Sequence, residues 1–236
     1  KSVGFKNYNY IGDPINAVRI FNDLKADEIV FLDIEATAQN RLISLDFVRD
    51  VGEEANMPFA VGGGIRTLND IESIIKAGAE RVIINSAAVH DEGFIKSACD
   101  AFGSSTVSVC IDVKKKLFKG TVVWSNAGKK ASTFSPIDFA QKMEELGVGE
   151  IIVQSIERDG SMLGYDIDLI ASISKAVKIP VIALGGAGSI EHLEQGFDQG
   201  FANGLAAGSL FVYHGSKKGV LINYPTKSEL NFKRTV

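Results

Sequence analysis

Cysteine is scarce in this chain of 236 residues, where Cys99 and Cys110 are the only two. They do not form a Cys-x-x-Cys pair, and the three histidines build no Cys/His cluster with them. This pattern argues against a disulfide framework and against a structural zinc site. So few cysteines are typical of a protein in a reducing compartment. We therefore expect a cytoplasmic protein without a bound metal, and no motif indicates a cofactor.

Two further absences narrow the class of partner. The chain has no run of 18 apolar residues, so no membrane-spanning helix is expected. It also has no excess of positive charge, because 25 Lys and Arg stand against 29 Asp and Glu, a net charge of −4. Proteins that bind nucleic acids usually carry a basic face. Neither a membrane nor a nucleic acid is therefore an expected partner, and 45% hydrophobic residues indicate a globular protein.

What the sequence does contain is a regular alternation of short apolar runs and amphipathic stretches. Most of the apolar runs are continuous, which is typical of parallel strands that are covered on both faces. Strands are predicted at residues 28–34, 58–61, 81–85, 106–112, 150–155, 179–184 and 204–209. Helices are predicted at residues 15–24, 42–54, 68–77, 92–102, 136–146, 167–176 and 190–199. Thr67, Ser135 and Ser189 stand where N-terminal caps are expected.

This alternation predicts a parallel α/β fold. The length is close to the roughly 250 residues of a (β/α)₈ TIM barrel, and we expect one barrel domain over residues 1–236. Only seven strands are visible, and the chain opens at Lys1 on a loop and a helix with no strand before them. We therefore expect the first strand of the barrel to be missing from this chain, by truncation or disorder. An open, doubly wound sheet of seven strands is the alternative.

The two halves of the chain resemble each other. Residues 58–70 and 181–192 both show an apolar strand, a glycine turn and a capped helix start. Each is followed by a helix and then by a strand that ends in small residues, at 85–88 and at 206–209. A duplicated half-barrel explains this repeat directly, whereas an open sheet does not.

The repeated glycine turns indicate anion binding. Gly62-Gly63-Gly64 and Gly185-Gly186-Ala187-Gly188 each lie between a strand and a helix start. Without Cβ atoms the backbone can approach a phosphate closely, and the backbone N–H groups at a helix start favour an anion. One such turn could serve the chain geometry alone. Two at equivalent positions predict two phosphate sites on opposite sides of one mouth, and thus a long ligand with a phosphate at each end.

Candidate chemistry lies at the carboxyl ends of the predicted strands, where barrel enzymes carry their active sites. Asp112 closes the apolar run 107–111 and could act as a general acid or base, or hydrogen-bond loop amides instead. Asp33 ends its strand in the same way and could bind substrate or orient other side chains. His90, His192 and His214 lie at predicted helix starts or after the last strand, so solvated or capping roles are expected for them.

Several blocks of the sequence carry a family resemblance. They are Val-Phe-Leu-Asp-Ile at 30–34, Val-Gly-Gly-Gly-Ile-Arg at 61–66, Ile-Asn-Ser-Ala-Ala-Val at 84–89, Ile-Asp-Val-Lys at 111–114, Gly-Glu-Ile at 149–151, Ser-Ile-Glu-Arg-Asp-Gly-Ser-Met-Leu-Gly-Tyr-Asp at 155–166 and Ala-Leu-Gly-Gly-Ala-Gly at 183–188. In this order, over roughly residues 1–214, the chain resembles the cyclase subunit of imidazole glycerol phosphate synthase.

The resemblance implies a (β/α)₈ barrel that takes ammonia from a separate glutaminase subunit. It implies a lyase and cyclase of histidine biosynthesis, which acts on a bisphosphorylated ribulosyl aminoimidazole-carboxamide ribonucleotide. The products of that reaction are imidazole glycerol phosphate and an aminoimidazole-carboxamide ribonucleotide. Ammonia must cross without meeting water, so a channel through the barrel core is a physical requirement.

The same resemblance assigns roles to individual residues. Asp112 matches the catalytic aspartate on the family's fourth strand. One phosphate site is matched by Gly63, Gly64, Asn85 and Ser86, and the rest of the ligand site by Asp159, Gly160, Gly185, Gly186, Gly208 and Ser209. Lys1 matches a lysine that follows the first strand. Glu80 and Arg81 match a charged pair near the glutaminase docking face and the ammonia entrance.

Two alternatives remain open at the level of sequence. The tail from Phe211 to Pro225 resembles a paralogous branch that uses channelled ammonia to form an acetamidino group on a nucleotide-linked sugar for surface glycans. A third possibility is a catalytically silent barrel that docks onto a glutaminase.

Overall fold

The computed structural model describes residues 2–117, 120–215 and 217–233. Its helices are α1 (Pro14–Asp23), α2 (Leu45–Glu54), α3 (Leu68–Lys76), α4 (Ser86–His90), α5 (Glu92–Phe102), α6 (Pro136–Glu145), α7 (Ile167–Ala176) and α8 (Ile190–Asp198), with a 3₁₀ turn η1 (Ser104–Thr106). Its strands are β1 (Ile29–Leu32), β2 (Phe59–Gly62), β3 (Arg81–Ile84), β4 (Val107–Lys116), β5 (Gly120–Ser125), β6 (Lys130–Ala131), β7 (Glu150–Ser155), β8 (Val181–Leu184), β9 (Gly204–Leu205), β10 (Tyr213–His214) and β11 (Gly219–Val220).

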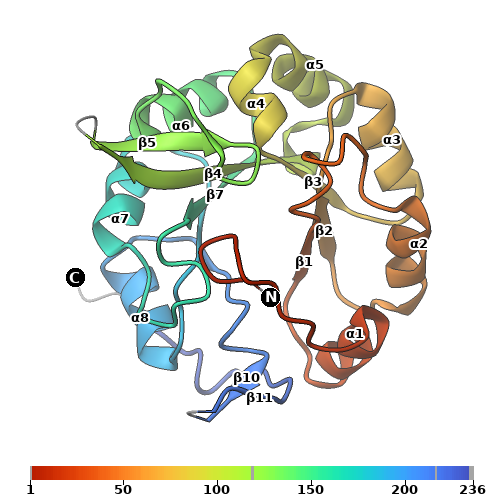
Figure 1. Cartoon of the computed structure of the whole chain (residues 1–236), viewed down its shortest axis with the longest axis vertical. Helices are drawn as coiled ribbons and strands as arrows, with labels where there is room; N and C mark the ends of the chain where they lie inside the picture. Colours follow the sequence, from red (N-terminus) through yellow and green to blue (C-terminus); the bar gives the residue numbers. More distant parts are fainter. Residues whose placement is uncertain (1, 118–119, 216, 234–236) are drawn as a thin grey trace.

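Strands β1, β2, β3, β4, β7, β8 and β9 form one sheet in this order, and every neighbouring pair is parallel. Figure 1 shows the sheet curling around a centre, with helices on its outside. The spatial order follows the chain order without the reversal that marks a doubly wound sheet. The fold is therefore an α/β barrel of the TIM type, as predicted. The strand expected upstream of Lys1 stays a prediction.

Caps explain where the helices begin. Thr67 and Asp70 form a capping box at the start of α3, because each side chain accepts a hydrogen bond from the other residue's backbone N–H. Ser135 and Ser189 accept from backbone N–H groups at the starts of α6 and α8, which confirms these predicted caps. Ser44 caps α2, so that helix begins at Leu45 rather than at the predicted residue 42.

The inner face of the sheet is arranged in levels, because alternate residues of a strand point to the same side. Near the amino ends of the strands lie Arg81, Ser108 and Glu150. Two residues further along lie Ile83, Cys110 and Ile152, which form a buried apolar cluster with Ala60. Two residues further again lie Asn85, Asp112 and Gln154. The sheet register supports these levels, since Ser108, Cys110 and Asp112 pair with Glu150, Ile152 and Gln154.

Three local predictions were wrong. The strand predicted to reach residue 85 ends at Ile84, and α4 begins at Ser86, because Ala87 and Ala88 favour a helix. The strand predicted at 204–209 covers only Gly204–Leu205. The run of three lysines at 114–116 predicts a solvated turn, but these residues lie in β4 and pair with β5 in an antiparallel hairpin. The alternating residues on either side of Gly120 do predict a hairpin, in agreement with the β4–β5 pairing.

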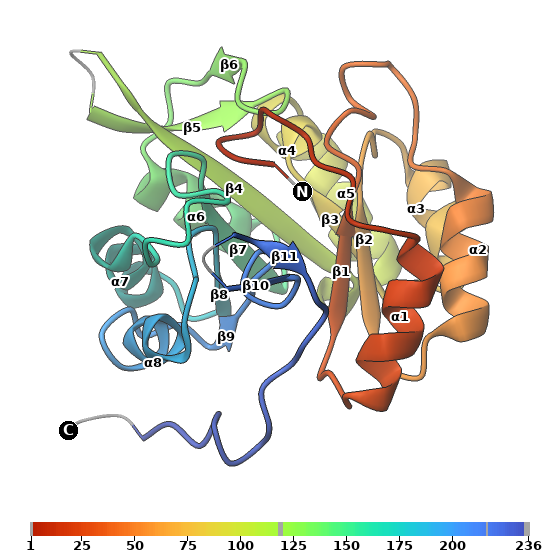
Figure 2. The ribbon, with the colours of Figure 1, turned by 60° about the horizontal axis from the view of Figure 1, so that its bottom comes forward.

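The end of the chain returns to the start of the sheet. After the β10–β11 hairpin, Tyr224 donates a hydrogen bond to Asp27 at 2.7 Å and its ring packs against Phe21 and Phe211. Figure 2 shows this segment running below the sheet, away from the β10–β11 hairpin. In the part of the chain that the structure describes, none of the helices is long and apolar enough to cross a membrane.

Candidate functional site

A pocket of about 460 Å³ opens at the carboxyl ends of the strands in the first half of the barrel. Its walls come from the loops after β1, β2 and β3 and from the β5–β6 turn. Six of the predicted site residues lie along it: Asp33, Gly63, Gly64, Asn85, Ser86 and Asp112. Its floor reaches the apolar level of the interior at Leu32, Ile83 and Cys110. The pocket thus connects the predicted site to the centre of the barrel.

Asp112 is the buried carboxyl group of this pocket, with 6% of its surface exposed. Loss of hydration raises its pKa to about 7, an effect that Asp159 strengthens by charge repulsion and that a hydrogen bond from Cys110 opposes. The Cys110 thiol donates to Asp112 Oδ1 across 3.5 Å. A carboxyl group with a pKa near neutrality can both accept and donate protons at physiological pH, as general acid–base catalysis requires.

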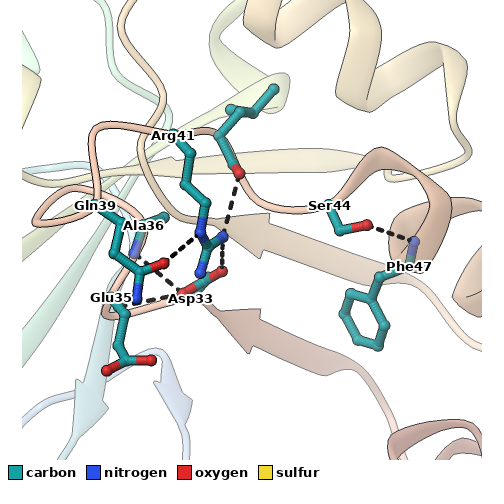
Figure 3. A network of polar contacts seen from close by, with 8 residues as sticks. Asp33, Glu35, Ala36, Gln39, Arg41, Ser44 and Phe47 are labelled. Carbon is teal, nitrogen blue, oxygen red and sulfur yellow. Dashed lines mark hydrogen bonds and ion pairs between the residues drawn. The ribbon is translucent and has the colours of Figure 1, made fainter.

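Asp33 is held within its own loop rather than free in the pocket (Figure 3). One carboxylate oxygen accepts hydrogen bonds from the backbone N–H groups of Glu35 and Ala36, both at 3.1 Å. The other oxygen forms an ion pair with Arg41 at 2.5 Å, and Arg41 also donates to Gln39. These contacts favour a role of Asp33 in orienting other side chains over a role in binding substrate. Asp33 orders the loop after β1.

The first glycine turn is shaped by close approach of the backbone. Gly63 and Gly64 have φ values of 142° and 71°, which side-chain-bearing residues rarely adopt. A Cβ atom on Gly64 would overlap the backbone carbonyl of Arg41, and one on Gly63 would lie 2.8 Å from Asp33 Cβ. Glycine is therefore required here by the fold of the β1 loop, whatever else the turn binds.

Asn85 and Ser86 join the end of β3 to the β4–β5 hairpin. Asn85 donates to the carbonyl of Cys110 at 2.9 Å, and its amide oxygen accepts a hydrogen bond from Ser86. The Ser86 hydroxyl in turn accepts from the backbone N–H of Asn126 at 2.9 Å. Both residues lie along the pocket wall, as predicted, and the network fixes their orientation.

His90 is a pocket residue that sequence reasoning missed. It was placed at a helix start, whereas the structure places it at the end of α4, on the pocket wall. Its Nε2 lies 3.2 Å from the hydroxyl of Ser125 on β5. No local sequence motif predicts this contact, because His90 and Ser125 are brought together only by the packing of the β4–β5 hairpin on α4.

In the second half of the barrel, Asp159 and Gly160 hold the N-terminal segment, which is defined here as residues 2–6. Asp159 Oδ2 accepts hydrogen bonds from the Ser2 hydroxyl at 2.7 Å and from the Phe5 N–H at 3.2 Å. A Cβ atom on Gly160 would overlap the carbonyl of Ser2. The N-terminal segment therefore lies between the two halves of the mouth, with Phe5 in the wall of the first pocket.

A second pocket of about 370 Å³ lies on the other side of this segment. The residues that line it are Ser2, Val3, Asn9, Tyr10, Gly160, Ser209, Tyr213, Lys217, Lys218 and Val220. Of the predicted residues, Gly160 and Ser209 lie here, whereas Gly185, Gly186 and Gly208 are in the walls of neither pocket. Gly186 repeats the geometry of Gly64, since its Cβ would overlap the carbonyl of Gly164. Lys1 falls outside the described residues.

A charged group closes the amino end of the barrel, opposite the pockets. Arg81 forms ion pairs with Glu150 at 3.0 Å and with Glu28 at 3.1 Å. Glu150 also accepts a hydrogen bond from Ser108. Desolvation raises the pKa of Glu28, and the charge of Arg81 opposes that rise. Glu80, the other residue predicted here, is exposed.

Within the described ranges, no three or more His, Cys, Asp or Glu side chains gather closely enough to hold a metal ion. The polar side chains of the first pocket are mainly carboxylates, amides and hydroxyls, with Arg66, His90 and the Cys110 thiol beside them.

Comparisons with known proteins found similar chains over most of this sequence. A family model described as "Histidine biosynthesis protein" matches residues 1–218. A Pseudomonas aeruginosa protein, "Putative imidazole glycerol phosphate synthase subunit hisF2", is 45% identical over 231 residues, 98% of this chain and 92% of that relative. Imidazole glycerol phosphate synthase subunit HisF of Clostridium botulinum (strain Okra / Type B1) is 43% identical over 214 residues, 90% of this chain and 85% of that relative. The HisF subunit of Alkaliphilus metalliredigens is also 43% identical, over 91% of this chain and 85% of that relative.

Proposed function

The chain belongs to the histidine biosynthesis protein family, and on that premise we propose that it is an ammonia-dependent cyclase subunit of imidazole glycerol phosphate synthase. Its proposed substrate is a bisphosphorylated ribulosyl aminoimidazole-carboxamide ribonucleotide, and its proposed partner is a glutaminase subunit that delivers ammonia. The reaction consumes ammonia, releases water, cleaves one carbon–nitrogen bond and closes an imidazole ring. Each of these steps moves protons, so the site needs a group that exchanges them near neutral pH.

The single observation that carries the proposal is the position of Asp112. Its carboxyl group lies in the wall of the first pocket, directly above the apolar level of the barrel interior, with its pKa raised to about 7. It can therefore take a proton from an attacking amine and return it to a departing group within one turnover. Asp33 is committed to Arg41 and Asp159 to the N-terminal segment, so Asp112 is the carboxyl group best placed for this role.

The three inner levels support delivery of ammonia through the barrel. The ion pairs of Arg81 lie at the amino end, the apolar cluster around Cys110 lies in the middle, and Asp112 lies at the top. An apolar middle level would let neutral ammonia pass while excluding ions. A glutaminase that docks at the amino end would release ammonia beside Arg81, whose ion pairs would have to open for it to enter.

The two pockets support a ligand with two anionic ends. The first pocket offers the backbone of its glycine turn, with Asn85 and Ser86 beside it in the same wall. The second offers the hydroxyl of Ser209, which is 9% exposed. The N-terminal segment lies between them, so an extended substrate must pass beneath this segment or displace it from Asp159.

The test is ammonia-dependent turnover of the bisphosphorylated substrate by the isolated chain, with Asp112→Asn as the matched variant. We expect turnover by the wild type and a decrease of about 10²-fold or more in the variant, the scale of a general acid–base contribution. Substrate binding, measured by titration, should persist in Asp112→Asn. Near-equal turnover by both proteins would remove Asp112 from the mechanism, and no turnover by the wild type would reject the proposed function.

One observation favours the paralogous reaction, in which channelled ammonia forms an acetamidino group on a nucleotide-linked sugar. It is the sequence of the tail from Phe211 to Pro225, which resembles that branch. Growth of a histidine auxotroph that lacks its own cyclase distinguishes the two, because only histidine synthesis restores growth without added histidine.

A further inference from the structure

We propose that the β10–β11 hairpin supplies a cationic wall, formed by Lys217 and Lys218, that binds a phosphate group in the second pocket. This inference rests on the proposed function, since the phosphate would be one end of the bisphosphorylated substrate. It assigns a binding role to a hairpin whose sequence otherwise indicated only a resemblance to the paralogous branch.

The charges along the second pocket favour an anion. Lys217 and Lys218 are the charged residues in its described wall, and no carboxylate accompanies them there. Neither lysine forms an ion pair with any residue that the structure describes. The first pocket differs, because Asp33, Asp91 and Asp112 in its wall outnumber Arg66. In the second pocket a phosphate would therefore meet positive charge with no carboxylate in the same wall.

The other groups of the second pocket suit a phosphate. Ser209 and Tyr213 contribute hydroxyl groups to its wall, and Tyr10 adds a third. Lysine binds phosphate as a point charge, and hydroxyl donors can complete the hydrogen bonds of the remaining phosphate oxygens. Asp159 directly precedes the pocket residue Gly160 in the sequence. Its carboxylate already accepts hydrogen bonds from the Ser2 hydroxyl and the Phe5 N–H, which reduces its repulsion of an incoming anion.

The hairpin that carries the lysines is anchored at both ends. The N–H of Lys218 donates to the carbonyl of Gly215 at 3.0 Å, which closes the turn. Below it, Leu221 and Asn223 donate to the carbonyls of Val212 and Phe211, both at 2.9 Å. The base of the hairpin is thus joined to the turn that follows Ser209. This connection keeps the two lysines over the pocket that contains Ser209.

The experiment is a titration of the full chain with inorganic phosphate, followed by the amide NMR signals of each pocket. Gly160 and Ser209 report on the second pocket, and Gly64 and Ser86 report on the first. In the double variant Lys217→Ala/Lys218→Ala, we expect the Kd from the second-pocket signals to rise about tenfold, equivalent to about 1.4 kcal/mol. The Kd from the first-pocket signals should not change. Lys227→Ala, an exposed lysine of the same tail outside the pocket, should leave both values unchanged.

Two results would overturn the proposal. One is a second-pocket Kd that is the same in the double variant as in Lys227→Ala. The other is the absence of phosphate-dependent shifts at Gly160 and Ser209 in the wild type. Loss of the proposed function has a different signature, because a wild type that binds phosphate in both pockets but turns over no substrate would reject the cyclase activity and leave the lysine wall intact.

Discussion

The thiol of Cys110 donates a hydrogen bond to the carboxylate of Asp112 across 3.5 Å, from two residues earlier on the same strand. Both side chains point to the inner face of the barrel, and both lie along the first pocket. Burial and the neighbouring carboxylate raise the pKa of the Cys110 thiol well above its usual value, so this group stays protonated and remains a donor. The thiol therefore stabilises the ionised form of Asp112 from below.

Replacing Cys110 with alanine should raise the pKa of Asp112, because the hydrogen bond that lowers it is removed. The inflection that Asp112 causes in the pH profile of kcat should move to higher pH, at a constant concentration of free ammonia. Cys99→Ala is the control, since Cys99 is buried in α5 outside the pocket. An unchanged inflection in Cys110→Ala, with kcat lowered equally at all pH values, would show that Cys110 only packs.

The ionisation of Asp112 should also affect stability. Below its ordinary pKa of 3.8 the carboxyl group is protonated in both the folded and the unfolded chain, so its ionisation does not lower the free energy of unfolding. Between pH 3.8 and about 7 the unfolded chain loses the proton while the folded chain retains it, so the free energy of unfolding falls. Above about pH 7 the carboxyl group is ionised in both states, and the loss in the free energy of unfolding stays constant at up to about 4 kcal/mol.

Asp112→Asn removes this cost. The free energy of unfolding of the variant minus that of the wild type should therefore be larger at pH 8 than at pH 4, by up to about 4 kcal/mol, as measured by denaturant unfolding. Asp23→Asn, which changes an exposed carboxylate at the end of α1, is the control variant. A stability difference for Asp112→Asn that does not depend on pH would mean that the carboxyl group titrates alike in the folded and unfolded chains.

The equivalence of Gly64 and Gly186 allows a test of the duplicated architecture. Each has positive φ, and a Cβ on either would overlap a loop carbonyl, that of Arg41 or of Gly164. Alanine at either position should lower the free energy of unfolding by a similar amount, about 3 kcal/mol or more, from backbone strain and steric overlap together. Gly103→Ala is the control, because Gly103 has φ of 84° but nothing within 4 Å of its added Cβ, so only the strain of about 1–2 kcal/mol remains. Equal losses in all three variants would show that steric overlap does not contribute.

The barrel class was predictable because its signal is local and repeated. Apolar runs such as that of β2, caps such as Thr67 and the two glycine turns each follow from a few adjacent residues. The same rules failed where a short segment satisfies two patterns, as at Ser86, where small residues after a strand began a helix. Propensity alone does not separate these outcomes, since the contact of Ser86 with Asn126 stabilises the local structure across 40 residues.

The site was predictable where it follows strand ends and hidden where distant segments meet. Asp112 could be placed in the mouth because it closes an apolar run. By contrast, Asp159 accepts hydrogen bonds from Ser2 and Phe5, which are more than 150 residues away, so the sequence could not show that this carboxylate holds the N-terminal segment. Lys217 and Lys218 lie in a tail without periodicity, and only the fold brings them to a pocket that also contains Gly160.

Arg81 should affect the source of nitrogen rather than the chemistry. Its two ion pairs lie at the amino end of the barrel, far along the strands from Asp112, and Arg81→Ala leaves Glu28 and Glu150 without their cation. We expect turnover with free ammonia, which can enter from the open mouth, to change by less than about twofold. Glutamine-driven turnover of the complex with the glutaminase should decrease by about tenfold, because the ammonia entrance and the docking face around it are altered. Equal losses with both nitrogen sources in Arg81→Ala would show that Arg81 only supports the fold.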